Sequence, residues 1–365
     1  MMGGPVSADV PSGTVDDFAH MWTWFATHCH DTSPLYERIS LAVAGDRALL
    51  EYLRTVPPAA QLPPALLAAV HYLVLDGADH ALAAIYAGEV HEDPGPPFLN
   101  FWRAHRDAVD HILASRHIQT NDCGRSALIA PALTWVASRF DIDRPLALVD
   151  VGASAGLNLR CDRYRIDYGS FGATGPDDSP VRIACKVVGG RPPIAPRLPR
   201  IVSRIGIDRS PVDLGDPDDV RWLLACVWPD SGRLERTAAS IRLAQADPPR
   251  VLAADANEAL PGVLAGLADG AVATVITTWA FAYLAPGERQ EFIGHLAAAS
   301  HLRDIAWVSA EGPGTVEPLE AEVASHPDRA GSDVLGAVLF HDGVPQTRLL
   351  GFAQEHGGWI DWRAD

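Results

Sequence analysis

The chain has 365 residues and a formal net charge of -17, and 48% of its residues are hydrophobic against 21% that are charged. This length exceeds the usual size of one domain, so the sequence predicts two domains with cores large enough to need no disulfides. Lys186 is the only lysine, and a surface this acidic repels phosphate backbones. Nucleic acid is therefore an unfavourable partner.

The cysteines and the apolar stretches bear on location. The cysteines are odd in number, far apart and without a C-x-x-C pair, which predicts reduced thiols rather than a disulfide frame or a zinc site: Cys29, Cys123, Cys161, Cys185 and Cys226. No lysine or arginine precedes Arg38, and no signal-like apolar segment follows the start. The longest apolar stretch, 271–284, is too short to cross a bilayer. We expect a cytoplasmic protein without a membrane partner.

The first part of the chain shows helical periodicity. Four apolar residues after Thr14 would share one helix face: Phe18, Met21, Trp22 and Phe25. Ser33-Pro34 provides an N-cap and a first-turn proline for a second helix. Further helices are predicted within 64–75 and 78–87, and one long helix over 98–113. Residues 1–118 are therefore predicted to form an all-helical domain or cap.

After Arg144-Pro145, short apolar runs alternate with helical stretches, which is typical of a parallel sheet covered on both faces. We predict strands at 146–151, 201–207, 251–254, 272–278 and 304–310. Two more, at 335–340 and 347–352, flank Asp342-Gly343 as an antiparallel hairpin. Residues 119–365 are thus predicted to be a doubly wound, mostly parallel α/β domain. Within it, a β-rich insertion at about 163–198 would pair 164–168 with 181–188 as a small hairpin.

The loop after the first strand carries the functional argument. A buried strand ends at Asp150, and a small-residue loop, Gly152-Ala-Ser154-Ala-Gly156, leads into a predicted helix that begins near Asn158. Such a loop lets a ligand approach the backbone closely. Ser154 breaks the dinucleotide pattern G-x-G-x-x-G, and no G-K-[ST] follows as in a P-loop. The spacing instead resembles the S-adenosylmethionine loop D/E-x-G-x-G-x-G, which implies that Asp150 lies near the amino-acid end of that ligand.

Two other interpretations of this loop remain open. Gly152-Ala-Ser154-Ala-Gly156 also satisfies the G-x-S-x-G elbow of serine hydrolases, with Ser154 as nucleophile and a later histidine as base: His326, His341 or His356. Against this, the chain before the elbow is helical, and Asp150 would have no role. The loop can also be a tight strand–helix connection without any ligand.

The next two strands end in acids as well. Asp208 follows the second strand, where a carboxylate would accept hydrogen bonds from ribose hydroxyls; an Asx-turn is the structural alternative. Asp255-Ala256 follows the third strand, where similar pairs in methyltransferases contact adenine. Asp255 with Glu258 is equally a helix capping pair. Ligands in open α/β sheets bind at this edge, so the three acids together favour a nucleoside ligand.

Several longer motifs resemble one family. They extend over nearly the whole chain: Gln119-Thr120-Asn121…Gly124-Arg125-Ser126, Val149-Asp150-Val-Gly152-Ala-Ser154-Ala-Gly156-Leu-Asn158-Leu159, Asp162-Arg-Tyr164-Arg-Ile-Asp167-Tyr168-Gly169, Asp216-Pro-Asp218-Asp219-Val-Arg221-Trp222 and Trp228-Pro229. The chain resembles the uncharacterised bacterial family known as domain of unknown function 2332. The resemblance implies a class I methyltransferase-like, Rossmann-like fold. Members often carry a histidine near position 277, where this chain has Thr277, so a histidine base is not expected.

Further site residues follow from this interpretation. Side chains after the fourth and fifth strands would face the methyl group, although core packing or loop capping would also explain them: Thr277, Thr278, Trp279, Tyr283 and Glu311. Of these, Thr277 is assigned to the cofactor and the rest are catalytic candidates. Asn121 and Arg125 precede the first strand, where methyltransferases often close over the ligand, and Arg125 could pair with a carboxylate or form a surface salt bridge. No metal is expected, since His28-Cys29-His30 lacks a third ligand.

These inferences give one expectation and two alternatives. We expect a methyltransferase that uses S-adenosylmethionine as cofactor and methylates a small molecule or a protein side chain. In-line methyl transfer requires alignment and exclusion of water more than a dedicated base. The alternatives are a serine hydrolase using Ser154 and a non-catalytic protein that binds S-adenosylmethionine.

Overall fold

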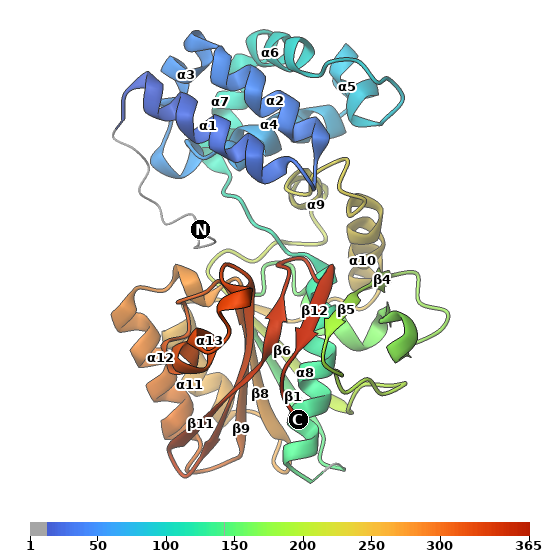
Figure 1. Ribbon diagram of the computed structural model, residues 1–365, viewed down its shortest axis with the longest axis vertical. Coiled ribbons are helices and arrows are strands. Elements are labelled where there is room, and N and C mark those ends of the chain that lie inside the picture. The colour runs from blue at the N-terminus through green and yellow to red at the C-terminus, as the bar shows by residue number, and fades with distance from the viewer. Residues whose placement is uncertain (1–12, 142) are drawn as a thin grey trace. The chain divides into compact units, whose positions relative to one another are not determined.

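The computed structural model describes residues 13–141 and 143–365, and the chain divides into two compact units (Figure 1). One is helical and comprises the described residues 13–120 together with 215–238. The other is a mixed α/β unit of residues 121–214 and 239–365. In the described part of the chain, no helix is both long enough and apolar enough to span a membrane.

The helical unit is built from short capped helices. Their bounds are α1 Val15–Cys29, α2 Pro34–Gly45, α3 Arg47–Leu53, α4 Pro63–Leu75, α5 Ala81–Tyr86, α6 Gly95–Ala104, α7 Arg106–Ser115 and α9 Pro217–Ala225. Thr14 and Asp17 form a capping box at the start of α1, and Ser33 caps α2. Asp216 caps α9, with Pro217 as its first residue. The predicted helix starts at Thr14 and Ser33 are confirmed.

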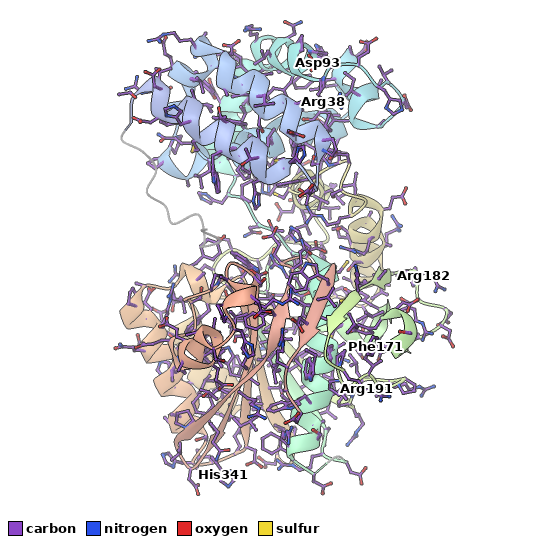
Figure 2. The ribbon with its side chains drawn as sticks, in the orientation of Figure 1. Arg38, Asp93, Phe171, Arg182, Arg191 and His341 are labelled. Carbon is purple, nitrogen blue, oxygen red and sulfur yellow. The ribbon has the colours of Figure 1, made fainter. Side chains whose placement is uncertain are left out.

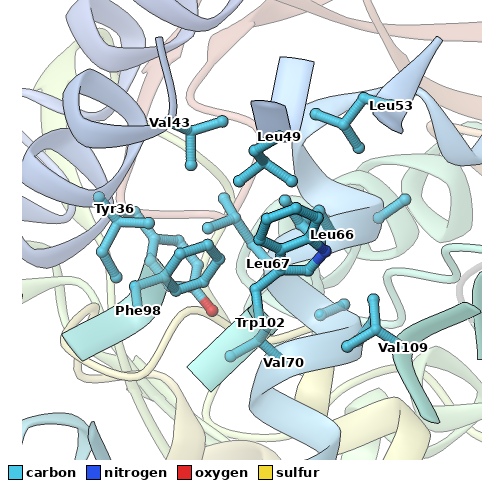
Figure 3. Close-up of a cluster of buried hydrophobic side chains, with 14 of the residues drawn as sticks. Tyr36, Val43, Leu49, Leu53, Leu66, Leu67, Val70, Phe98, Trp102 and Val109 are labelled. Carbon is cyan, nitrogen blue, oxygen red and sulfur yellow. The ribbon is translucent and has the colours of Figure 1, made fainter. Parts of the chain in front are cut away.

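The core of this unit forms around α4, which is apolar on most of its surface. Leu66, Leu67 and Val70 of α4 are fully buried and belong to the same cluster as Tyr36 and Trp102 (Figure 3). A helix that is apolar all round is stable only when neighbours cover it, and here the surrounding helices do so.

The predicted single helix over 98–113 is wrong, because it breaks at His105 into α6 and α7. His105 has φ -116° and ψ 24°, outside the helical range, and its ring lies 4.3 Å from that of Phe101. Phe101 and Val109, on either side of the break, are both fully buried in the same core. The apolar spacing continues across the break, so periodicity alone does not reveal it.

His71 in α4 predicts a pH dependence of the helical unit. Burial lowers the pKa of His71 to about 4, and its Nδ1 lies 3.1 Å from the carbonyl oxygen of Ala225. Because the folded pKa is below the ordinary value of 6.5, the unfolded chain binds the proton first. The contribution of neutral His71 to the free energy of unfolding is fully present above pH 6.5. It decreases by at most about 3 kcal/mol as the pH falls from 6.5 to 4. Hydrogen exchange of the α4 amides should show lower stability at pH 5 than at pH 7, and His71→Gln should reduce this difference. An equal difference in the variant and the wild type would contradict the assignment.

The α/β unit contains a nine-stranded sheet in the order β5-β12-β11-β10-β9-β8-β1-β6-β7. The strands are β1 Leu146–Val151, β5 Lys186–Gly189, β6 Ile201–Asp208, β7 Val251–Ala253, β8 Val272–Thr278, β9 Ile305–Glu311, β10 Asp333–His341, β11 Val344–Ala353 and β12 Trp359–Trp362. Strands β7-β6-β1-β8-β9 are parallel, and β6 and β8 flank β1 on opposite sides. The chain therefore reverses direction across the sheet beside β1, where open α/β sheets bind ligands.

The large, mostly parallel sheet and the C-terminal hairpin were predicted, and both are present. Strands β10 and β11 pair antiparallel around Asp342 and Gly343, whose φ angles are 46° and 80°. Positive φ at both central residues is the geometry that a two-residue hairpin turn prefers. Strand β12, which the sequence did not suggest, pairs antiparallel with β11, and β5 adds to its outer edge.

Helices cover both faces of the sheet (Figure 1). These helices are α8 Ser126–Arg139, α11 Ala256–Ala265, α12 Pro286–Ala299 and α13 Glu320–Ala324. A further helix, α10 Leu234–Ala246, begins in the helical unit and ends in the α/β unit. One face packs on α11 and α12, in a cluster that includes Val149, Val275, Trp307 and Val334; we call it the α11/α12 core. Because side chains alternate along a strand, the intervening residues face α8 on the opposite side.

The inserted segment differs from the predicted hairpin. Strands β2 Arg165–Asp167, β3 Ala173–Thr174 and β4 Arg182–Ala184 form a separate sheet in the order β3-β2-β4. The predicted pairing of 164–168 with 181–188 is wrong in direction, since β2 and β4 are parallel and β3 supplies the antiparallel partner. The connection between β2 and β4 is long enough for a crossover, which a parallel pair requires. After β4 the chain passes from this small sheet to the large one, where residues 186–189 form β5.

Candidate functional site

Four strands bring polar side chains to one edge and one face of the large sheet. Val149 and Val151 belong to the α11/α12 core, so Asp150 between them faces α8. The same alternation turns Asp208, Thr278 and Asp333 to the α8 face at the ends of β6, β8 and β10. Strand β10 runs antiparallel to β9, and therefore its first residue lies at the carboxyl edge of the parallel strands. We call this region the α8-face edge.

Asp150 is the most deeply buried acid of the α8-face edge. Asp150 is 1% exposed, and its Oδ2 atom is buried without a hydrogen-bond partner. Burial raises the pKa of Asp150 to about 8; Arg125 opposes this shift, and the nearby Asp208 adds to it. An unpaired carboxylate oxygen in such a place is costly, and the position is suited to a ligand that donates a hydrogen bond and carries positive charge.

Arg125 lies in the short helix η2 (Cys123–Arg125), directly before α8, and is 6% exposed. Its guanidinium donates to the carbonyl oxygen of Thr278 at 2.9 Å, and its Nε donates to that of Glu355 at 3.3 Å. These bonds connect the segment before β1 with the ends of β8 and β11. The sequence interpretation of Arg125 as a surface salt bridge is wrong, because the side chain is buried at this edge.

The loop between β1 and the next helix is held by backbone contacts. Gly152, Ser154 and Gly156 all have positive φ, at 77°, 50° and 71°. The backbone N–H of Ser154 donates to Asp208 Oδ2 at 2.8 Å, and that of Ser210 donates to Oδ1 at 2.8 Å. A side chain at Gly152 would collide with the Cβ atom of Ala280. Asp208 thus joins the loop to the end of β6, in addition to forming the Asx-type turn that the sequence allowed.

The helix predicted after this loop is present as a short 3-10 helix. Residues Leu157–Arg163 form the 3-10 helix η3, with non-helical angles at Arg160, because β2 begins only two residues later. The first N–H of η3, on Leu157, donates to Asn121 Oδ1 at 3.0 Å. This end of η3 is therefore not an open anion site. Asn158 Nδ2 donates to Thr278 Oγ1 at 3.2 Å, while its Oδ1 atom is buried without a partner.

Two candidates, Thr277 and Glu311, face the α11/α12 core rather than α8. Trp307 Nε1 donates to Thr277 Oγ1 at 3.1 Å. The fully buried Glu311 carboxylate accepts hydrogen bonds from three backbone N–H groups after β8, those of Ala280, Phe281 and Ala282. Burial raises the pKa of Glu311, against the effect of these bonds. Loop capping, one of the explanations open from the sequence, accounts for Glu311.

Asp255 and Ala256 lie after β7, at the outer end of the sheet. Asp255 Oδ1 caps α11 by accepting from Asn257 at 2.9 Å, and its Oδ2 accepts two bonds from Arg209. The Arg209 guanidinium lowers the pKa of Asp255. Ala256 is the first residue of α11. The capping role that the sequence allowed for Asp255 is thus present, and both carboxylate oxygens are engaged.

Trp279 and Tyr283 follow β8 and differ in environment. Trp279 has φ 54°, and its Nε1 donates to Asp333 Oδ2 at 2.9 Å. Tyr283, in η5 (Phe281–Tyr283), is 81% exposed. Asp333 was not among the residues predicted for the site, and burial raises its pKa to about 7. The predicted antiparallel hairpin could have revealed it, since the first residue of such a strand lies at the ligand-binding edge.

The three histidines considered for a hydrolase lie in different places. The ring of His326 packs on Phe352 at 5.5 Å. His341 is exposed at the turn of the β10–β11 hairpin, at the end of the sheet opposite the α8-face edge (Figure 2). His356 lies between two carboxylates, with Asp122 Oδ2 3.1 Å from Nδ1 and Glu355 Oε1 3.0 Å from Nε2.

A family model described as "Uncharacterized protein conserved in bacteria (DUF2332)" matches residues 19–362. The chain belongs to this family. The match includes η2, the β1 loop and the start of β10, so the α8-face edge lies within the family's sequence pattern. No curated protein and no solved structure matches the chain.

Metal ligands and thiols add little to the site of this DUF2332 member. No three His, Cys, Asp or Glu side chains among residues 13–141 and 143–365 converge as a metal site. The cysteines are free thiols, and all except Cys226 are fully buried. Burial raises the pKa values of Cys29 and Cys185 to about 12, which makes these thiols unreactive.

Proposed function

We propose that this protein is a methyltransferase that uses S-adenosylmethionine. The observation that carries the proposal is the buried Asp150 carboxylate, which has an unpartnered oxygen at the end of β1, beside the point where the strand order reverses. The α-ammonium group of S-adenosylmethionine supplies the positive charge and the N–H donors that this oxygen lacks. Asn158 Oδ1, a second buried acceptor without a partner at the same edge, suits another of those N–H donors.

The neighbouring residues fit the rest of the ligand. Arg125 provides a positive charge for the ligand carboxylate and acts electrostatically on Asp150. Each oxygen of Asp208 accepts one backbone N–H, which leaves capacity for the ribose hydroxyls, because an ionised carboxylate accepts about four hydrogen bonds. Asp255 gives less support for adenine binding, since Arg209 and the α11 cap use both of its oxygens.

The chain's own part in the reaction would be alignment. S-Adenosylmethionine, when bound, supplies an activated methyl group on a sulfonium. The β1 loop, held to Asp208, would orient the ligand along the edge, and the segment 279–283 after β8 would shape the space beside it. Fixing two reacting groups in line can lower the activation free energy by about 7–11 kcal/mol. The proposal therefore needs no metal and no histidine base.

A second candidate is a serine hydrolase. Ser154 has φ 50° within G-x-S-x-G, and a strained turn of this kind also occurs at hydrolase nucleophiles. The placement of His341 at the opposite end of the sheet and of His326 on Phe352 weakens this candidate.

Calorimetric titration tests the proposal. We expect S-adenosylmethionine and S-adenosylhomocysteine to bind the full-length protein and NAD not to bind. Asp208→Asn should weaken binding about tenfold or more, since it removes a charged acceptor worth about 1.5–3 kcal/mol. Asp247→Asn is the matched control, because Asp247 pairs with Arg160 outside the proposed site.

Three outcomes would change this conclusion. Binding of NAD in place of S-adenosylhomocysteine would overturn it. Phosphonate labelling that disappears in Ser154→Ala would favour the hydrolase. Tight binding of S-adenosylmethionine without transfer of a labelled methyl group to any acceptor in cell extract would favour a binding protein.

A further inference from the structure

The α8-face edge carries two acidic positions, and the proposed cofactor uses only one. Asp150 is the second-last residue of β1, whereas Asp333 begins β10, three strands further along the sheet. At about 4.8 Å between neighbouring strands, their backbones are separated by about 14 Å across the sheet. Arg125 interacts electrostatically with both carboxylates. Asp333 therefore lies beside the proposed cofactor position rather than within it.

The Asp333 carboxylate has unused capacity to accept hydrogen bonds. Asp333 is 8% exposed, and Trp279 Nε1 donates a hydrogen bond to its Oδ2 at 2.9 Å. An ionised carboxylate can accept about four hydrogen bonds, so this single bond leaves the buried acid with capacity for a ligand. Glu355 and Glu311 add negative charge around it, and Arg125 is the positive group that opposes them.

Trp279 gives this position an aromatic wall. It directly follows β8, the strand next to β1, and its indole N–H fixes the Asp333 carboxylate in place. Residue Trp279 is of intermediate burial rather than sealed in the core. An aromatic face next to a carboxylate binds organic cations, because the ring quadrupole and the negative charge both attract them.

We propose that Trp279 and Asp333 bind the methyl acceptor and that this acceptor is a protonated amine. The assignment of the amine as acceptor rests on the proposed methyltransferase function; its binding at Asp333 does not. The ammonium gives one N–H proton to the Asp333 carboxylate. The nitrogen lone pair then forms the bond to the methyl carbon, while the carbon–sulfur bond breaks and its electrons remain on sulfur.

Matched probes test the recognition step. Benzylamine, which is protonated at neutral pH, and the neutral benzyl alcohol are titrated into the full-length protein, each with and without S-adenosylhomocysteine, and binding is followed by ligand-observed NMR. We expect benzylamine to bind wild type at least tenfold more tightly than benzyl alcohol. Asp333→Asn should reduce this ratio to twofold or less, whereas Asp247→Asn should leave it unchanged. S-Adenosylhomocysteine affinity should change less than threefold in both variants.

The pH dependence supplies a second readout. Burial raises the pKa of Asp333 to about 7, helped by Glu355 and Glu311 and opposed by Trp279 and Arg125. The carboxylate is charged above that pH, so the preference for benzylamine should be larger at pH 8 than at pH 6. Equal binding of the two probes by wild type, or a preference that persists in Asp333→Asn, would overturn the inference. Failure of S-adenosylhomocysteine to bind, with the amine preference intact, would overturn the methyltransferase proposal and the amine's role as acceptor, but not amine binding at Asp333.

Discussion

Asp150→Asn is expected to weaken the binding of S-adenosylhomocysteine by about 10- to 100-fold and, at the same time, to stabilise the unliganded protein. The loss of binding follows from removing the charge that faces the ligand's ammonium, since a charged hydrogen bond is worth about 1.5–3 kcal/mol. The gain in stability follows from burial, which raises the pKa of Asp150 to about 8. One substitution should therefore move affinity and stability in opposite directions, as at many functional sites.

The size of the stability change depends on pH. The folded pKa of Asp150 lies above its ordinary value of 3.8, so the folded state binds the proton more tightly than the unfolded state. Wild-type stability therefore decreases as the pH rises from about 4 to about 8. The advantage of Asp150→Asn should be absent near pH 4 and greatest above pH 8. There we expect about 1–3 kcal/mol, less than the full pKa shift implies, because the variant also loses the favourable electrostatic interaction with Arg125.

Urea unfolding at pH 4.5 and 8.5, together with calorimetry at pH 8, measures both effects. Asp247→Asn serves again as control, since it removes a carboxylate that is 69% exposed. Wild-type affinity in the Asp150 variant would refute the assignment of this residue to the ligand. Equal stability of variant and wild type at both pH values would instead refute its buried, unpaired state.

Glu311→Ala is expected to destabilise the α/β unit by about 3–5 kcal/mol, although Glu311 was a catalytic candidate. The substitution leaves three N–H groups at the start of the 280–283 segment without their acceptor, and each unsatisfied buried group costs about 1–3 kcal/mol. The segment can relax toward solvent, so the total cost should be smaller than the sum over the three N–H groups. Amide protection at Phe281 should fall most, because that N–H is buried.

Two variants separate capping from catalysis by Glu311. Glu311→Gln retains one carbonyl acceptor and should cost only about 1–2 kcal/mol. Glu320→Ala, at an exposed position of α13, should change stability by less than about 0.5 kcal/mol. Chemical denaturation and hydrogen exchange provide the measurements. If the free energy of unfolding of Glu311→Ala lies within 1 kcal/mol of the wild-type value, the capping role is wrong.

Most of the sheet was predictable from local patterns. The apolar runs, the turn at Asp342-Gly343 and the caps at Thr14 and Ser33 each depend on near neighbours in the chain, and each is present in the structure. The break at His105 and the 3-10 helix after Gly156 were not predictable in this way. Packing of the helices on either side of His105 in one core, and the early start of β2 after η3, are not visible in the apolar periodicity of these segments.

The candidate site was predictable only in part for the same reason. A strand that ends in an acid places it at the carboxyl edge, so Asp150 and Asp208 could be chosen from the sequence. Which face each residue occupies depends on how the sheet packs. Thr277 and Glu311 therefore lie away from Asp150, and Asp333 arrives from a strand 183 positions later in the numbering.

Short-range chemistry thus determined the elements of this protein: the strand ends, the helix caps, the small-residue loop and the hairpin turn all act over a few residues. Tertiary packing alone decided which side chains share the α8-face edge, because facing and burial arise when α8 and the α11/α12 core close over opposite sides of the sheet. Burial also decided the unusual pKa values of Asp150 and Asp333, since a carboxylate loses its water only when distant segments surround it.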